Sequence, residues 1–203
     1  MPVIHLLSPN IVVLHGYETH CDGILGPLAE TICRTALPIL QGDPSKRAIL
    51  LGGWHLKEAG DVITIADAME LWLLEHDIHP DQIITQKHFP ALHGYMPPRD
   101  TWEEVVLLRK MFHALRISPE QAFDSIAWDF HIPRLKKIYR TYHFMRPTAL
   151  PATTEPYKGL IYRKRKEWAA RILYILDPTG TGVLCHEARI KRTLAQDRQP
   201  LIP

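Results

Sequence analysis

The chain has 203 residues, of which 46% are hydrophobic and 23% charged, and its formal net charge is +2 at pH 7. This composition is typical of a soluble globular protein with one substantial core plus an appendage, and it excludes a disordered chain. A net charge this small gives no indication of a nucleic-acid partner. The three cysteines lie at unrelated spacings without a CxxC pair. They therefore favour a reducing compartment and predict neither a disulfide framework nor a zinc site.

The N-terminal segment MPVIHLLSPN has no basic region before its apolar run, and His5 and Pro9 interrupt that run. It matches neither a secretory signal peptide nor a membrane span. We therefore expect a cytoplasmic protein without a membrane-spanning segment.

The first half of the chain alternates short apolar runs with helical patterns. Residues 10–16 (NIVVLHG) and 47–54 (RAILLGGW) contain apolar runs that end at glycine, as strands buried on both faces do. Helical spacing follows each of them, at residues 28–40 and 64–77. Residues 81–86 (DQIITQ) predict a weaker third strand.

The pattern continues after a proline-containing loop at residues 87–100. Residues 101–115 show clear helical spacing, and residues 123–128 (FDSIAW) predict a fourth strand. A helix that opens on proline is predicted at residues 133–140, and a short fifth strand at residues 142–145 (YHFM). This alternation predicts an α/β, three-layer Rossmann-like fold with a mainly parallel sheet of about five strands.

The pattern changes after the proline-spaced segment RPTALPATTEP at residues 146–156. Residues 157–176 predict a helix with an apolar stripe that includes Trp168 and Ile172, and its basic run at residues 163–166 is interpreted as a solvated face. We divide the chain into an α/β domain at residues 1–155 and a C-terminal helical extension at residues 156–203. We expect the extension to pack on the same domain or on a partner, so that a homo-oligomer could form through these helices.

Residues 177–188 (DPTGTGVLCHEA) superficially resemble a calcium loop. Only Asp177 supplies a carboxylate among the early ligand positions, and Ala188 stands where a bidentate glutamate is needed. We therefore expect no metal site.

Glycines and polar residues gather where the predicted strands end. In an open parallel sheet, ligands bind beyond the carboxyl ends of the strands, where helix N-termini point their amides outward. This rule selects candidate ligand-binding residues, which are Gly16, Glu18, Gly52, Gly53, Trp54, Thr101, Glu104, Asp129 and Arg134. It also selects two candidate catalytic residues, His131 and Asp100.

Several of these residues also have a structural interpretation. Gly52 and Gly53 lie either in a tight turn or where the backbone approaches a phosphate or ribose. Their spacing matches neither the GxGxxG fingerprint nor a P-loop. Thr101 and Glu104 match a capping box, an interpretation that we favour and that leaves Asp100 as the better ligand candidate.

His131 and Arg134 flank the predicted start of a helix at Pro133. At that position an imidazole can act in acid-base chemistry, and a guanidinium can hold an anion with two hydrogen bonds. We expect both side chains to open into a cleft shared with Gly52, Gly53 and Asp100.

Four short motifs follow one another between about residues 10 and 140: IVVLHG, ILLGG, TWEE and FHIPR. In this order they resemble the YdcF-like family, which includes SanA and ElyC. The resemblance implies a Rossmann-like fold and, from the family's archetype, binding of S-adenosylmethionine. Carried over one by one, the matching positions are Gly52, Gly53, Thr101, Glu103, His131, Pro133 and Arg134.

The chain departs from the family's pattern at three positions. His15 stands where the family usually has glycine, and Glu104 replaces an asparagine. Ile65 stands where an acidic residue is common, unless Asp67 takes that role.

The sequence thus predicts a protein that binds a nucleotide-like or phosphorylated small molecule, with Arg134 and the Gly53 amide holding anionic groups. Any enzymatic activity would be phosphoester or group-transfer chemistry with His131 as the acid-base group. Two alternatives stay open: an S-adenosylmethionine-binding protein, and a non-enzymatic interaction module built on the C-terminal helices.

Overall fold

The computed structural model describes residues 11–16, 25–53, 56–58, 61–92, 98, 100–144 and 147–152, and five single residues further on: Arg165, Trp168, Ala169, Ile172 and Leu176. The chain divides into two compact units, Met1–Thr154 and Glu155–Pro203. The described residues of the second unit are helical.

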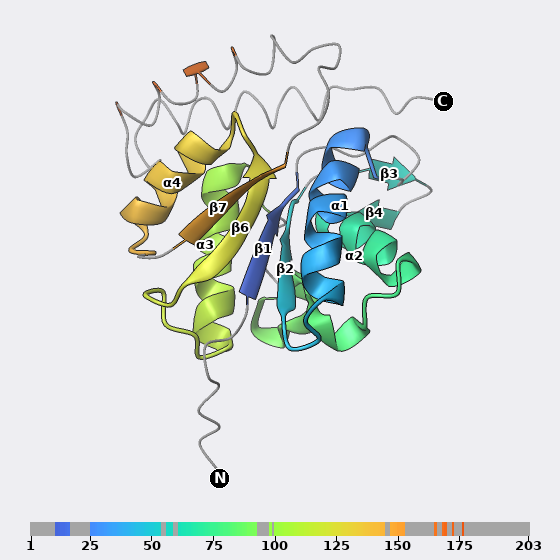
Figure 1. Ribbon diagram of the computed structural model, residues 1–203. Helices are drawn as coiled ribbons and strands as arrows, with labels where there is room; N and C mark the ends of the chain where they lie inside the picture. The colour runs from blue at the N-terminus through green and yellow to red at the C-terminus, as the bar shows by residue number, and fades with distance from the viewer. Residues whose placement is uncertain are drawn as a thin grey trace. The chain divides into compact units, whose positions relative to one another are not determined.

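Five parallel strands form the central sheet of the first unit (Figure 1). In chain order they are β1 (Ile11–His15), β2 (Arg47–Leu51), β5 (Ile83–Ile84), β6 (Phe123–Trp128) and β7 (Pro147–Ala152). Their order in space is β5-β2-β1-β6-β7. The chain moves outward from β1 to β5 and then returns to the other side of β1. This reversal places a topological switch point, where open α/β sheets bind ligands, between β1 and β6.

Helices cover the sheet. They are α1 (Pro27–Gln41), α2 (Ile65–Glu75), α3 (Thr101–Ala114) and α4 (Ile132–Thr141). Helix α1 packs against α2 and α3 packs against α4, and in Figure 1 β6 and β7 pass in front of α3. Every residue of β1 is buried, as expected for a strand covered on both faces. The predicted three-layer α/β fold with a parallel sheet is confirmed.

Short elements complete the first unit. Three 3-10 helices surround β5: η1 (Pro80–Gln82), η2 (Gln86–His88) and η3 (Pro90–Leu92). An antiparallel pair between β2 and α2, which the sequence did not predict, consists of β3 (Leu56–Glu58) and β4 (Asp61–Ile63).

The fifth strand was predicted in the wrong place. We expected it at residues 142–145, but it is β7, within the proline-spaced segment that we had interpreted as a linker. Strand β7 is an edge strand that pairs with β6 alone. Because Pro147 and Pro151 are four residues apart, their backbone nitrogens point to the same side of the strand. Their missing N–H groups can therefore lie at the free edge, where no ladder hydrogen bond is lost.

Helices α2, α3 and α4 end in the same way, with a non-glycine residue in the left-handed conformation. Asp77, Arg116 and His143 have φ angles of 64°, 57° and 60°. The amide of the next residue reaches back by five positions in each case, with N···O distances of 2.8 to 3.1 Å: Ile78 to Leu73, Ile117 to Phe112, and Phe144 to Tyr139. Ile78 and Phe144 are fully buried, so an apolar contact fixes these helix ends.

In the second unit, Trp168, Ile172 and Leu176 follow one another at four-residue spacing. They are 65%, 36% and 64% exposed. The possible calcium loop and most of the basic run lie outside the described residues. None of the helices described is long and apolar enough to cross a membrane.

Candidate functional site

A chain of hydrogen-bonded side chains joins β1, α3, α4 and β6 near the carboxyl end of the sheet. Nδ1 of His15, the last residue of β1, lies 2.9 Å from Oε2 of Glu104. Nε2 of the same ring lies 2.5 Å from the hydroxyl oxygen of Tyr139. That hydroxyl is 3.0 Å from Oγ of Ser125. All four side chains are buried, so we call them the His15 chain.

The chemistry of these groups orders the protons along the His15 chain. An ionised Glu104 can only accept, so His15 donates from Nδ1. Nε2 of a neutral imidazole then accepts from Tyr139, whose oxygen accepts in turn from Ser125. Burial raises the pKa of Tyr139 above its ordinary value, although the hydrogen bond with Ser125 opposes this rise. The phenol therefore keeps its proton and remains a donor to His15.

A second cluster lies at the start of α4. Nη2 of Arg134 donates to Oγ1 of Thr101 at 2.8 Å and to Nδ1 of His131 at 3.0 Å. Nε2 of His131 lies 3.0 Å from the same Thr101 oxygen. Because a guanidinium cannot accept, Nδ1 of His131 carries no proton, and Nε2 donates to Thr101. His131 is 4% exposed and Arg134 is 9% exposed, so the triangle is an internal one.

The two clusters are neighbours, because the rings of His15 and His131 have centroids 6.5 Å apart. Together they contain one buried carboxylate, Glu104, and one buried guanidinium, Arg134. The charges balance, as a buried polar cluster requires. The fold thus brings together four residues that the sequence selected from two separate segments: Thr101, Glu104, His131 and Arg134.

The predicted capping box at Thr101 is wrong. The N-cap of α3 is Asp100, whose Oδ1 accepts from the amide of Glu103 at 3.0 Å. Thr101 is the first helical residue, and its hydroxyl turns to His131 and Arg134. The sequence allowed both choices, because Asp100 and Glu103 repeat the same spacing one residue earlier.

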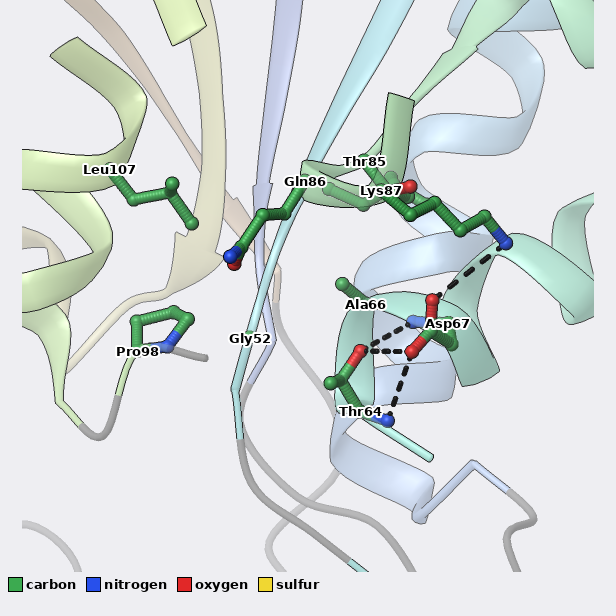
Figure 2. Close-up of a pocket in the computed structure, with 10 residues that line it drawn as sticks. Gly52, Thr64, Ala66, Asp67, Thr85, Gln86, Lys87, Pro98 and Leu107 are labelled. Carbon is green, nitrogen blue, oxygen red and sulfur yellow. Dashed lines mark hydrogen bonds and ion pairs between the residues drawn. The ribbon is translucent and has the colours of Figure 1, made fainter. Parts of the chain in front are cut away.

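A cavity of about 270 Å³ lies at the carboxyl ends of β2 and β5 (Figure 2). Its apolar lining consists of Leu50, Ala66, Pro98 and Leu107. Its polar lining consists of Thr64, Asp67, Thr85, Gln86 and Lys87, and Gly52 completes it. Figure 2 shows Gln86 extending toward Leu107 and Pro98, with Thr64 and Asp67 grouped at the start of α2.

Hydrogen bonds and ion pairs fix the polar side of this cavity. Oδ2 of Asp67 accepts from the hydroxyl of Thr64 at 2.6 Å and from its amide at 3.1 Å. The Thr64 hydroxyl oxygen accepts from the Asp67 amide at 3.0 Å, which completes a capping box. Nζ of Lys87 lies 2.6 Å from Oε2 of Glu70 and 3.8 Å from Oδ1 of Asp67.

The glycines at the end of β2 permit close packing. Gly52 has a φ of 152°, and a Cβ atom there would lie 2.9 Å from Cβ of Ile65. At Gly53 a Cβ atom would overlap the carbonyl oxygen of Pro98. These contacts support the structural interpretation of the glycine pair, and Gly52 also lines the cavity.

The other predicted site residues lie apart from the cavity. Its lining includes Gly52 but neither His131, Arg134 nor Asp100. Asp129 is exposed, and its Oδ1 accepts from the Phe130 amide. Glu18 and Trp54 lie outside the described residues.

None of the five polar residues of the cavity was among the predicted site residues: Thr64, Asp67, Thr85, Gln86 and Lys87. Gln86 ends the predicted third strand and Lys87 follows it, so the same strand-end rule would have selected them. No group of three or more His, Cys, Asp or Glu side chains in the described part of the chain is placed to hold a metal ion. Comparisons with protein-family models, curated proteins and solved structures found no match.

Proposed function

We propose that the protein binds a nucleotide-like small molecule at the carboxyl edge of the sheet, with the nucleoside part in the cavity. The observation that supports this proposal is the position of the cavity at the carboxyl ends of β2 and β5, on the β2 side of β1 and therefore one strand away from the switch point between β1 and β6. Open α/β sheets hold their ligands at such edges. The apolar walls suit a planar base, and the Gln86 side chain, whose Nε2 donates to the Leu92 carbonyl at 3.1 Å, extends along them (Figure 2).

The size of the cavity limits the ligand. Its volume of about 270 Å³ is close to the lower end of the range for small-molecule sites, roughly 300 to 1,000 Å³. It therefore suits a single nucleoside and not a dinucleotide. The chain also lacks the GxGxxG spacing of a dinucleotide site.

An anionic group that further atoms of the ligand separate from the nucleoside would lie outside the cavity, nearer the switch point, whereas a phosphate bonded directly to the nucleoside would lie beside Asp67. Nη2 of Arg134 already donates to Thr101 and His131, so Arg134 would hold such a group through the other N–H groups of its guanidinium or by exchanging one of these two hydrogen bonds. A phosphoester or group-transfer activity would use His131 as the acid-base group. In the tautomer that these contacts require, Nε2 of His131 carries the proton and donates a hydrogen bond to Oγ1 of Thr101.

Binding of S-adenosylmethionine is a second candidate. Asp67 and Lys87 line the cavity, and Lys87 forms ion pairs with both Asp67 and Glu70. The two carboxylates outnumber the single ammonium, so this wall carries a net negative charge. A ligand with a sulfonium cation suits this balance. The motif order shared with the YdcF-like family also favours it, and membership of that family is itself part of this proposal.

A cytoplasmic interaction module is the third candidate. It is favoured by the exposed Trp168 and Leu176 of the C-terminal unit, which suit a homo-oligomer contact.

A thermal-shift panel of nucleosides, nucleotides, sugar phosphates and S-adenosylmethionine tests the proposal. A ligand at one hundred times its Kd stabilises the fold by about 2.7 kcal/mol. We expect a nucleoside-containing compound to raise the Tm, and Leu107→Trp, which fills the cavity, to abolish the shift. Leu71→Trp on the exposed surface of α2 is the control and should keep it. No shift with any nucleoside-containing compound contradicts the proposal, as does a shift that Leu107→Trp leaves unchanged.

A further inference from the structure

The single cation on the described cavity wall is already neutralised. Nζ of Lys87 forms a short ion pair with Glu70, at 2.6 Å, and lies 3.8 Å from Asp67. The three groups together carry one negative charge. A phosphate entering the cavity would meet this excess of carboxylate with no other lysine or arginine in the described lining.

Three backbone amides at the start of α2, where helices often bind anions, already donate to groups of the protein. The Ala66 amide donates to the Gly52 carbonyl at 3.1 Å. The Asp67 amide donates to Thr64 Oγ1 at 3.0 Å, and the Thr64 amide donates to Asp67 Oδ2 at 3.1 Å. The carboxylate of Asp67 also occupies the positive end of the helix dipole.

Asp67 has one oxygen suited to a ligand hydroxyl. Both contacts with Thr64 use Oδ2. Among the described residues Oδ1 has only the Lys87 ammonium nearby, at 3.8 Å, which is beyond hydrogen-bonding distance. The Asp67 side chain is 31% exposed and lines the cavity. A carboxylate oxygen in this position can accept from a sugar hydroxyl.

Resting on the function proposed above, we propose that the cavity selects a nucleoside group that is uncharged or cationic. Oδ1 of Asp67 accepts a hydrogen bond from a sugar hydroxyl of this group, and phosphate is excluded from the cavity. The apolar contacts of the base with Leu50 and Leu107 supply affinity, and the carboxylates supply the discrimination against anions.

Calorimetric titration with adenosine, 5′-AMP and S-adenosylmethionine tests this selectivity. Adenosine should bind at least tenfold more tightly than 5′-AMP. Asp67→Asn should weaken adenosine binding about ten- to a hundredfold, the effect of losing one charge-assisted hydrogen bond. Asp81→Asn is the matched control, because that carboxylate is 90% exposed and does not line the cavity. S-Adenosylmethionine binding more tightly than adenosine would support the cationic form of the ligand.

A second variant avoids dependence on the capping role of Asp67. Gln86→Lys adds a cation to the cavity wall and should reverse the preference toward 5′-AMP. Tighter binding of 5′-AMP than of adenosine to the wild type, lost in Lys87→Gln, would overturn this inference while leaving the proposed function intact. Binding of none of the three compounds, or of any related nucleoside, would contradict the proposed function itself.

Discussion

Nη2 of Arg134 donates to Nδ1 of His131, at 3.0 Å, and this contact fixes the protonation state of the imidazole. A histidine that accepts at Nδ1 is neutral and carries its proton on Nε2. Arg134, which we predicted to hold an anion, and His131, which we predicted to be the acid-base group, therefore form an internal unit with Thr101.

Removal of Arg134 should destabilise the fold. Arg134→Ala leaves Thr101 and His131 without their charged donor inside the domain, and we expect a loss of about 1 to 3 kcal/mol in the free energy of unfolding. Urea unfolding measures this change. Arg134→Lys, the conservative control, restores the charge but cannot reproduce the fixed guanidinium geometry, so it should recover only part of the loss. An unchanged free energy in Arg134→Ala would show that the internal hydrogen bonds contribute little.

The stability of the protein should fall in alkali. Burial raises the pKa of the Cys33 thiol above its ordinary value of 9.0, with a smaller contribution from Glu30. Burial likewise raises the pKa of Tyr139 above 10.0. The folded protein keeps both protons after the unfolded chain has released them, so this stability is complete below pH 9 and declines above it. Each group adds a slope of up to about 1.4 kcal/mol per pH unit.

Unfolding by urea between pH 8 and pH 10.5 measures this decline. Cys33→Ala should reduce the slope between pH 9 and pH 10, whatever its effect on absolute stability. An identical slope in the wild type and the variant would contradict the assignment to Cys33.

Glycine at the three left-handed helix ends should stabilise the protein. Asp77→Gly, Arg116→Gly and His143→Gly each relieve the steric cost of a positive φ, which exceeds the entropy that glycine adds to the unfolded chain. We expect each substitution to raise the free energy of unfolding by about 0.5 to 1 kcal/mol, and the three effects to be nearly additive in the triple variant. Calorimetry should show a higher Tm for each variant.

The control for these helix ends is a glycine within a helix. Leu71→Gly replaces an exposed residue inside α2. It should lower the free energy of unfolding by about 1 kcal/mol, because glycine disfavours the helix and relieves no positive φ at this position. A loss of stability in all three helix-end variants would show that their side chains make the larger contribution.

Gly53 should tolerate no side chain. Gly53→Ala would make Cβ overlap the Pro98 carbonyl oxygen. The two segments would have to separate, at a cost of about 1 to 3 kcal/mol in the free energy of unfolding. Gly42→Ala is the matched control. A Cβ atom at Gly42 would lie 3.0 Å from its nearest neighbour, the Pro38 carbonyl oxygen, and Gly42 has a φ of −74°, which alanine readily adopts. Equal Tm values for the two variants would argue against the close packing at Gly53.

The apolar runs predicted four of the five sheet strands because each is buried on both faces. Strand β7 escaped detection because two prolines are compatible with the free edge of a sheet, a property that depends on the neighbouring strand and not on local sequence. Strands β3 and β4 contain three residues each. This length is too short to show the alternation of apolar and polar residues from which a strand is predicted.

For the candidate site, residue types and strand ends selected Thr101, Glu104, His131 and Arg134 among the candidate residues, but not their grouping. His131 and Arg134 were expected to share a cleft with Gly52, Gly53 and Asp100. Their partners were harder to foresee. Tyr139 and Ser125 face His15 only because α4 packs beside β6, and a tyrosine within a helix otherwise suggests core packing. The charge balance of the cavity depends on the approach of Lys87 to Glu70 from separate elements, which no local pattern reveals.

A crystal structure of the protein soaked with adenosine tests the central claim most directly. Our account predicts electron density for the nucleoside between Leu50 and Leu107, with a sugar hydroxyl within about 3 Å of Oδ1 of Asp67. Adenosine density elsewhere on the molecule, with the cavity unchanged, would contradict the account.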